Sequence, residues 1–150
     1  MIPGGLVQRL LPALFCILVA GGCSTEAPVH EIVSLNDGCV KIPVTTVDDG
    51  RVHFFTYHHD GRNVNFLVRT DGEGTLHAHL DACYACYRYK RGFVFEDPHL
   101  VCIACRLEYA VADEVWDYIG ACAPISVHSK VVGDELTIDA DTLKRAARYF

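Results

Sequence analysis

The chain has 150 residues, 51% of them hydrophobic, with 13 Lys and Arg against 19 Asp and Glu, a formal net charge of −6. This length is enough for one domain with a core of its own. The acidic balance argues against nucleic acid as a partner, because binding to a phosphate backbone needs an excess of positive side chains.

The N-terminus has the form of an export signal. Arg9 is the only charged residue in the first 25, and an apolar run at 10–20 ends in Gly21-Gly22-Cys23. The run is too short to span a bilayer, which takes about 20 apolar residues. Residues 19–23 resemble the lipobox of bacterial lipoproteins, which predicts a lipoprotein signal peptide over 1–22 and acylation of Cys23. The alternative is ordinary cleavage, which gives a free secreted protein.

Residues 23–37 are polar without a clear period, so we expect a flexible tether there and a folded domain over 38–150. Asp-Gly pairs at 49–50, 60–61 and 71–72 indicate hairpin turns. The segments with strand character are 40–47, 51–58, 63–70, 75–81, 106–111 and 135–138.

We also expect a turn of helix at 113–117 and a short C-terminal helix from about Thr142, capped by Asp139 or Asp141. The prediction is a mostly β, α+β domain in which an antiparallel meander leads into Cys83.

Two C-x-x-C pairs, Cys83 with Cys86 and Cys102 with Cys105, are separated by fifteen residues. Each pair can point two thiolates to one side of a tight turn, and two facing turns complete a tetrahedral four-sulfur site for Zn²⁺ or Fe. Four such thiolates can also hold an iron-sulfur cluster. The intervening segment is long enough for a short β-hairpin, so the spacing predicts a ribbon-like metal site.

Other cysteine chemistry stays open at this point. After loss of Cys16 and acylation of Cys23, an even number of cysteines remains, which an exported disulfide framework also predicts. Thiol-disulfide exchange is less well supported, since no long helix follows either pair. The remaining cysteines are Cys39, Cys83, Cys86, Cys102, Cys105 and Cys122.

From about residue 39 to the end, the chain resembles the FtrD-like family of predicted membrane iron-sulfur proteins, which accompany bacterial iron and copper uptake systems. The ordered combination of motifs is more specific than the cysteine spacing alone. The residues that carry the resemblance are Asp81-Ala-Cys-Tyr-Ala-Cys-Tyr87, Lys90-Arg-Gly-Phe93, Val101-Cys-Ile-Ala-Cys105, Ile119-Gly-Ala-Cys-Ala-Pro124 and Val132-Gly-Asp-Glu-Leu-Thr-Ile138.

The resemblance implies a metal or iron-sulfur centre on the two C-x-x-C pairs, with Cys122 as a possible further ligand, beside a metal permease or an electron-transfer chain. This chain has Arg106 where the family tends to have Gly after the last cysteine of the second pair. Asp81 and the turn amides are expected to surround the ligands. Cys122 has a second open role, a disulfide with Cys39.

His77 and His79 alternate on the strand before Cys83 and therefore project to one face together with Asp81. This spacing allows a mixed nitrogen and oxygen metal site. The alternative is a solvated strand face, which we favour.

Together these features predict an exported, lipid-anchored protein of the cell envelope that binds an iron-sulfur cluster or a single Fe or Zn ion. It would serve metal-ion uptake or the associated electron transfer, next to a permease or an electron-transfer membrane protein. The alternatives are a thiol-disulfide redox protein and a partner-binding module stapled by zinc or disulfides. The sequence carries no recognisable hydrolase or nucleotide-binding motif.

Overall fold

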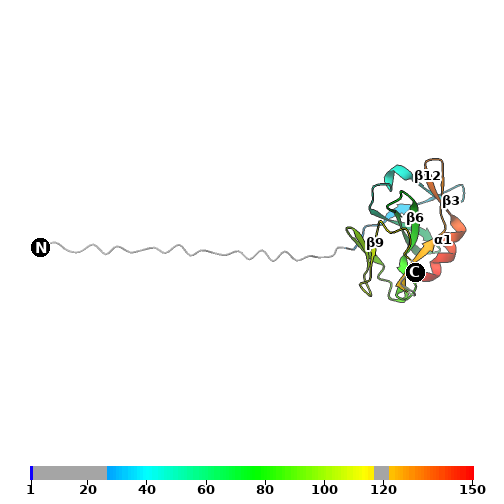
Figure 1. The fold of residues 1–150 in the computed structure, drawn as a ribbon. Coiled ribbons are helices and arrows are strands. Elements are labelled where there is room, and N and C mark those ends of the chain that lie inside the picture. Colours follow the sequence, from blue (N-terminus) through cyan, green and yellow to red (C-terminus); the bar gives the residue numbers. More distant parts are fainter. Residues whose placement is uncertain (2–26, 117–121) are drawn as a thin grey trace.

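The computed structural model describes residues 1, 27–116 and 122–150, which form three β-sheets and a short C-terminal helix (Figure 1). The expected signal peptide, the acylation site Cys23 and part of the expected helical turn at 113–117 lie outside the described residues. In the described part, no helix is both long and apolar enough to cross a membrane.

The central sheet contains the antiparallel meander that the sequence predicts. Its strand order is β1-β4-β5-β6-β10, and only β1 runs parallel to its neighbour. The β4–β5 hairpin turns through Asp60 and Gly61, both with positive φ, as the Asp-Gly pair requires. The strands are β1 (Glu31–Val33), β4 (Val52–His59), β5 (Arg62–Thr70), β6 (Leu76–Cys83) and β10 (Pro124–Val127).

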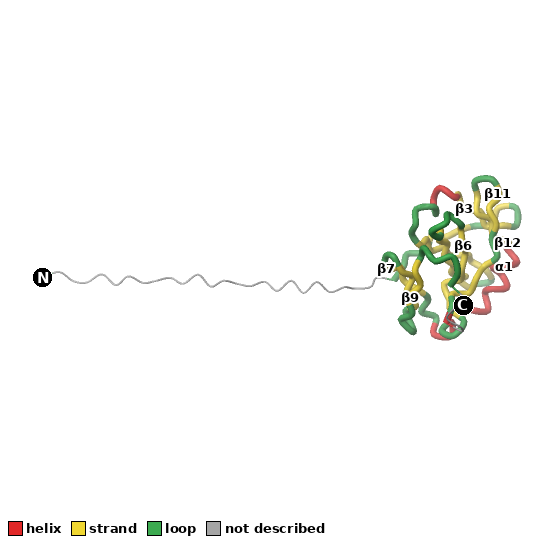
Figure 2. The backbone as a smooth tube through the Cα atoms, viewed as in Figure 1, coloured by secondary structure: helices red, strands yellow, loops and turns green. Residues whose placement is uncertain are grey.

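One face of this sheet packs against a second sheet, of order β11-β12-β3-β2, and against helix α1 (Ala140–Ala146) (Figure 2). Alternate residues of β5 and β6, such as Phe66 and Leu80, supply this larger core. The helix continues as the 3-10 helix η4 (Ala147–Tyr149). The strands are β2 (Leu35–Asn36), β3 (Cys39–Pro43), β11 (Lys130–Val132) and β12 (Glu135–Asp139), and β3 leads into η1 (Val44–Thr46).

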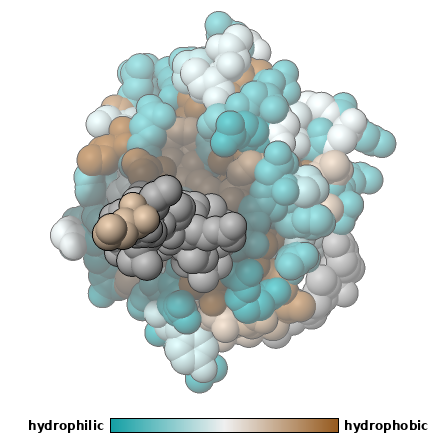
Figure 3. Space-filling view, turned by 90° about the vertical axis from the view of Figure 1, so that its left-hand side faces the viewer, coloured by the Kyte–Doolittle hydropathy of each residue, from teal (hydrophilic) through white to brown (hydrophobic). Residues whose placement is uncertain are grey.

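The opposite face of the central sheet packs against a third sheet, formed by β7 (Phe93–Glu96), β8 (His99–Cys102) and β9 (Glu108–Ala110). β7 and β8 are the hairpin expected between the two C-x-x-C pairs, and Phe93 pairs with Cys102 in its register. The molecular face on this side mixes hydrophilic and hydrophobic residues (Figure 3). The hairpin carries the second cysteine pair back to the end of β6.

Several details differ from the sequence prediction. β1 and β2 lie within 23–37, so the packed domain begins before residue 38 and the expected tether is shorter. The expected strand at 106–111 is reduced to β9, and residues 113–116 contain no helix. The C-terminal helix begins at Ala140, with Asp139 as its N-cap.

The N-cap gives a first testable prediction. The Asp139 side chain accepts a hydrogen bond of 2.8 Å from the backbone N–H of Asp141. Asp139→Ala is expected to lower the free energy of unfolding by about 1 kcal/mol, measured by urea denaturation. Asp141→Ala is the control, because this exposed first-turn residue only pairs with Lys144 and its loss is expected to cost less. Equal losses in the two variants would contradict the cap assignment.

Candidate metal centre

The first C-x-x-C pair forms a turn at the end of β6. The backbone N–H of Cys86 donates to Cys83 Sγ at 3.1 Å, so the chain folds back around the first sulfur. The 3-10 helix η2 (Tyr87–Tyr89) follows, and Lys90 ends it in a left-handed conformation. Cys83 is 2% exposed and Cys86 is half-buried.

The second pair repeats this turn at the end of β8. Cys102 Sγ accepts hydrogen bonds from the backbone N–H groups of Ala104 and Cys105, and Cys105 Sγ accepts one from Leu107. The Arg106 N–H donates to the Cys102 carbonyl at 2.8 Å, and Arg106 has a φ of 61°. Backbone N–H groups therefore point at sulfurs in both turns, which stabilises thiolates.

The two turns bring three of the four predicted sulfurs together. The Sγ atoms of Cys83, Cys86 and Cys102 all lie within 4.8 Å of one another. Cys105, which is exposed, places its thiol against those of Cys86 and Cys102. A tetrahedral ion with sulfur bonds of about 2.3 Å separates its ligands by about 3.8 Å. The spacing of these three sulfurs is therefore compatible with a bound metal ion, and Cys105 is outside the group of three.

Cys122 lies at the edge of this cluster, with its thiol next to that of Cys105. The Tyr109 hydroxyl of β9 donates to the Cys122 carbonyl and so fixes this position. All six described cysteines are free thiols, and Cys39 is on β3 opposite Asp139. The disulfide suggested between Cys39 and Cys122 is not formed, since both thiols are free.

The cluster is electrostatically adapted to a cation. Burial, followed by the neighbouring thiols, raises the pKa of Cys86 far above its usual range. Burial likewise raises the pKa of Cys102 to about 11. For Cys105, burial also raises the pKa, but the Leu107 N–H and the adjacent thiols outweigh it, so the pKa is lowered overall. A bound cation would replace the thiol protons and remove the cost of packing several thiolates together.

Asp81 joins the two turns. Its Oδ1 accepts a hydrogen bond of 2.7 Å from the Phe93 N–H at the start of β7, and its Oδ2 bonds His30 Nε2 at 2.9 Å. The Gly92 carbonyl next to Phe93 accepts from the Ile103 N–H inside the second turn at 3.1 Å. These hydrogen bonds connect the Asp-Ala-Cys motif with the Gly-Phe motif. We call the set formed by Asp81, His30, Gly92, Phe93 and Ile103 the Asp81 clamp.

A cavity of about 540 Å³ adjoins the cluster, and Cys83, Cys86 and Cys102 form part of its wall. Lys90 Nζ, also in the wall, donates to the Tyr149 carbonyl at 2.7 Å, which ties the C-terminal segment to the first turn. His30 also lines this cavity. It was not predicted as a site residue, because it lies within the expected tether.

The structure does not bring His77 and His79 to the cysteine cluster. They line a separate cavity, and the favoured expectation of a solvated face is wrong for His79, which is 5% exposed. Its ring stacks on Trp116 at 4.9 Å between centroids, and Trp116 packs beneath the buried Arg69. These contacts join residues far apart in the sequence, so no local pattern could have indicated them.

The clamp gives a second testable prediction. Gly92 has a φ of +64°, and a Cβ built on it would lie 2.5 Å from Asp81 Oδ1. Gly92→Ala is expected to lower the free energy of unfolding by about 2 kcal/mol or more, from the left-handed backbone and the displaced carboxylate. Gly133→Ala is a matched control with a φ of +65° and no atom within 4 Å, expected to cost about 1 kcal/mol. Equal losses in thermal unfolding would contradict the clamp.

Arg106 gives a third prediction. It holds the left-handed conformation that favours glycine, and its exposed side chain pairs with Glu96 at 3.2 Å. Arg106→Gly is expected to raise the free energy of unfolding by about 1 kcal/mol, since the strain relieved exceeds the value of an exposed ion pair. Arg106→Ala keeps the strained backbone and loses the pair, so it should give no gain in the same urea titration. A destabilised glycine variant would contradict this explanation.

The comparison with known families agrees with this geometry. A model of the family described as "Membrane iron-sulfur containing protein FtrD-like" matches residues 47–150, which include both cysteine turns and Cys122. No curated protein matches the chain. Because the match covers more than half of the sequence, the chain belongs to the FtrD-like family of membrane iron-sulfur containing proteins.

Proposed function

We propose that the protein is a lipid-anchored iron-binding protein of the cell envelope that serves electron transfer in metal-ion uptake. The observation that carries this proposal is the convergence of the Cys83, Cys86 and Cys102 sulfurs within 4.8 Å, with Cys105 beside them. Iron bound by four thiolates changes its oxidation state without losing its ligands, which zinc in the same site cannot do.

The access to the site supports exchange of electrons with a partner. Cys83 and Cys102 are 2% exposed, which shields an ion from water, whereas Cys105 is exposed and provides an edge for contact. The solvent exposure of a sulfur-bound iron, and the N–H groups that point at its sulfurs, set its reduction potential. A partner that docks over Cys105 would approach the ion closely.

The expected anchor supports a partner in the membrane. His30 bonds Asp81 next to the centre, and acylated Cys23 would lie seven residues earlier in the chain. An extended chain spans at most about 3.6 Å per residue, so this segment is at most about 25 Å long. The centre would then stay near the membrane surface, within reach of a permease or an electron-transfer membrane protein.

One observation favours a second candidate, a thiol-disulfide redox protein. Cys105 is exposed as a residue. Partial burial of its sulfur raises the pKa of the thiol, but hydrogen bonds outweigh this effect and lower the pKa overall, as in reactive cysteines. Its partner Cys102 has a pKa raised to about 11 by burial, so the pair is poorly matched for rapid exchange. The iron-binding function therefore ranks first.

The test is metal and sulfide analysis, with a visible absorption spectrum, of the full chain purified without oxygen. We expect one iron per chain and sulfur-to-iron charge-transfer bands, because the sulfur spacing fits one tetrahedral ion. Cys86→Ser should lose both. Cys39→Ser is the control, since this cysteine lies outside the cluster, and it should keep both.

Two outcomes would overturn the proposal. Colourless protein with stoichiometric zinc, grown with iron available, would indicate a structural site. Metal-free, folded protein whose cysteines are oxidised would support the redox or disulfide-stapled alternatives.

A further inference from the structure

A second cavity, of about 440 Å³, lies over β6 and the edge strand β10, apart from the cysteine cluster. Its wall contains the polar side chains of His77, His79, Ser126 and His128. These four share a face because Ser126 is opposite His79 in the antiparallel β6–β10 register, and strand residues two apart project to the same side. Three imidazoles therefore gather from two neighbouring strands.

His79 is buried in this wall at 5% exposure, yet neither ring nitrogen has a hydrogen-bond partner within the described part of the chain. Trp116 holds the ring in place by stacking, and its own indole N–H is used by the Ala110 carbonyl at 2.8 Å. A buried polar group without a partner is destabilising unless a ligand satisfies it. Stacking thus holds the His79 ring, and a neutral imidazole keeps a lone pair on one of its two nitrogens.

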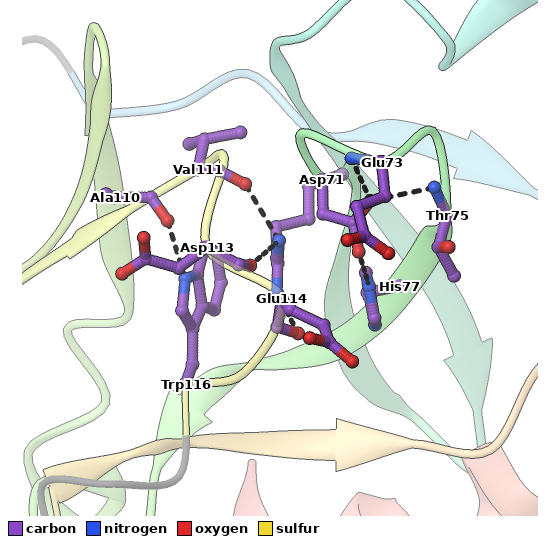
Figure 4. A network of polar contacts seen from close by, with 10 residues as sticks. Asp71, Glu73, Thr75, His77, Ala110, Val111, Asp113, Glu114 and Trp116 are labelled. Carbon is purple, nitrogen blue, oxygen red and sulfur yellow. Dashed lines mark hydrogen bonds and ion pairs between the residues drawn. The ribbon is translucent and has the colours of Figure 1, made fainter.

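A carboxylate orients the His77 ring, as is common for metal-binding histidines. Its Nε2 bonds Asp71 Oδ2 at 2.7 Å, and Asp71 Oδ1 accepts from the Glu73 and Thr75 N–H groups at 3.0 and 2.8 Å (Figure 4). A carboxylate on one ring nitrogen fixes the tautomer and increases the basicity of the other. The Nδ1 of His77 is left as its available ligand atom.

Two charged groups lie beside the histidines, namely Asp71, which bonds His77, and Arg69, which packs over Trp116. Arg69 is the nearby positive group, and its guanidinium donates to the carbonyls of Val111, Asp113 and Glu114.

We propose that His77, His79 and His128 form a second metal site, independent of the cysteine centre, that binds a divalent transition-metal ion such as Zn²⁺ or Cu²⁺. Imidazole nitrogen is a preferred ligand of these ions. The rings of His77 and His79 lie 6.4 Å apart between centroids, with 27° between their planes, so binding of one ion by both rings requires their side chains to move. His128 is exposed and also lines the cavity, so we assign it as the third ligand.

The test is zinc titration of the full chain by calorimetry, with histidine ring ¹⁵N NMR to identify the bound nitrogens. We expect one zinc equivalent that Cys86→Ser leaves in place and that shifts the resonances of His77, His79 and His128. His79→Phe keeps the stacking on Trp116 and should abolish this equivalent. His128→Gln, at an exposed position, should weaken it at least tenfold.

His58→Gln is the matched control, because His58 is exposed at the far end of the β4–β5 hairpin and bonds Asn63. It should bind zinc as the unchanged chain does. Urea denaturation of each variant separates loss of the site from loss of the fold, and His128→Gln keeps the test valid if His79→Phe unfolds. Unchanged binding in both His79→Phe and His128→Gln, or an equal loss in His58→Gln, would overturn the proposal.

Discussion

The buried carboxylate of Asp81 is the contact on which the metal centre depends. It lies two residues before Cys83 on β6, and it fixes the N–H of Phe93, whose strand leads through the hairpin to Cys102. The two cysteine turns follow strands of different sheets, and this hydrogen bond joins the two sheets next to the site. The same carboxylate binds His30, so the segment that follows the expected anchor is attached at this point too.

Strand β6 positions several other functional side chains besides that of Cys83. Its alternate residues His77, His79, Asp81 and Cys83 face one side of the central sheet, and the intervening residues fill the larger core on the other. One strand face therefore carries, in order, the histidine cavity, the Asp81 clamp and the first cysteine of the candidate metal site. The larger core keeps this face rigid, which suits ligands that must be positioned before an ion arrives.

Local patterns predicted much of this arrangement. Asp-Gly turns and β-branched runs indicated the β4–β5–β6 meander, and the two C-x-x-C pairs indicated the ribbon-like site with its hairpin. The sequence patterns could not predict contacts between residues far apart in the chain. The position of Cys122 depends on Tyr109, and the burial of His79 depends on Trp116. β1 was missed because three residues that pair with β4 leave too short a pattern to detect.

The most direct test of the central claim is X-ray absorption at the iron edge of the full chain purified without oxygen. A single ion in the cysteine cluster predicts one shell of four sulfurs at about 2.3 Å and no neighbouring iron. A second shell from iron would contradict this account, because it would require a cluster wider than the observed sulfur spacing. A shell of nitrogen or oxygen instead of sulfur would place the iron elsewhere in the molecule.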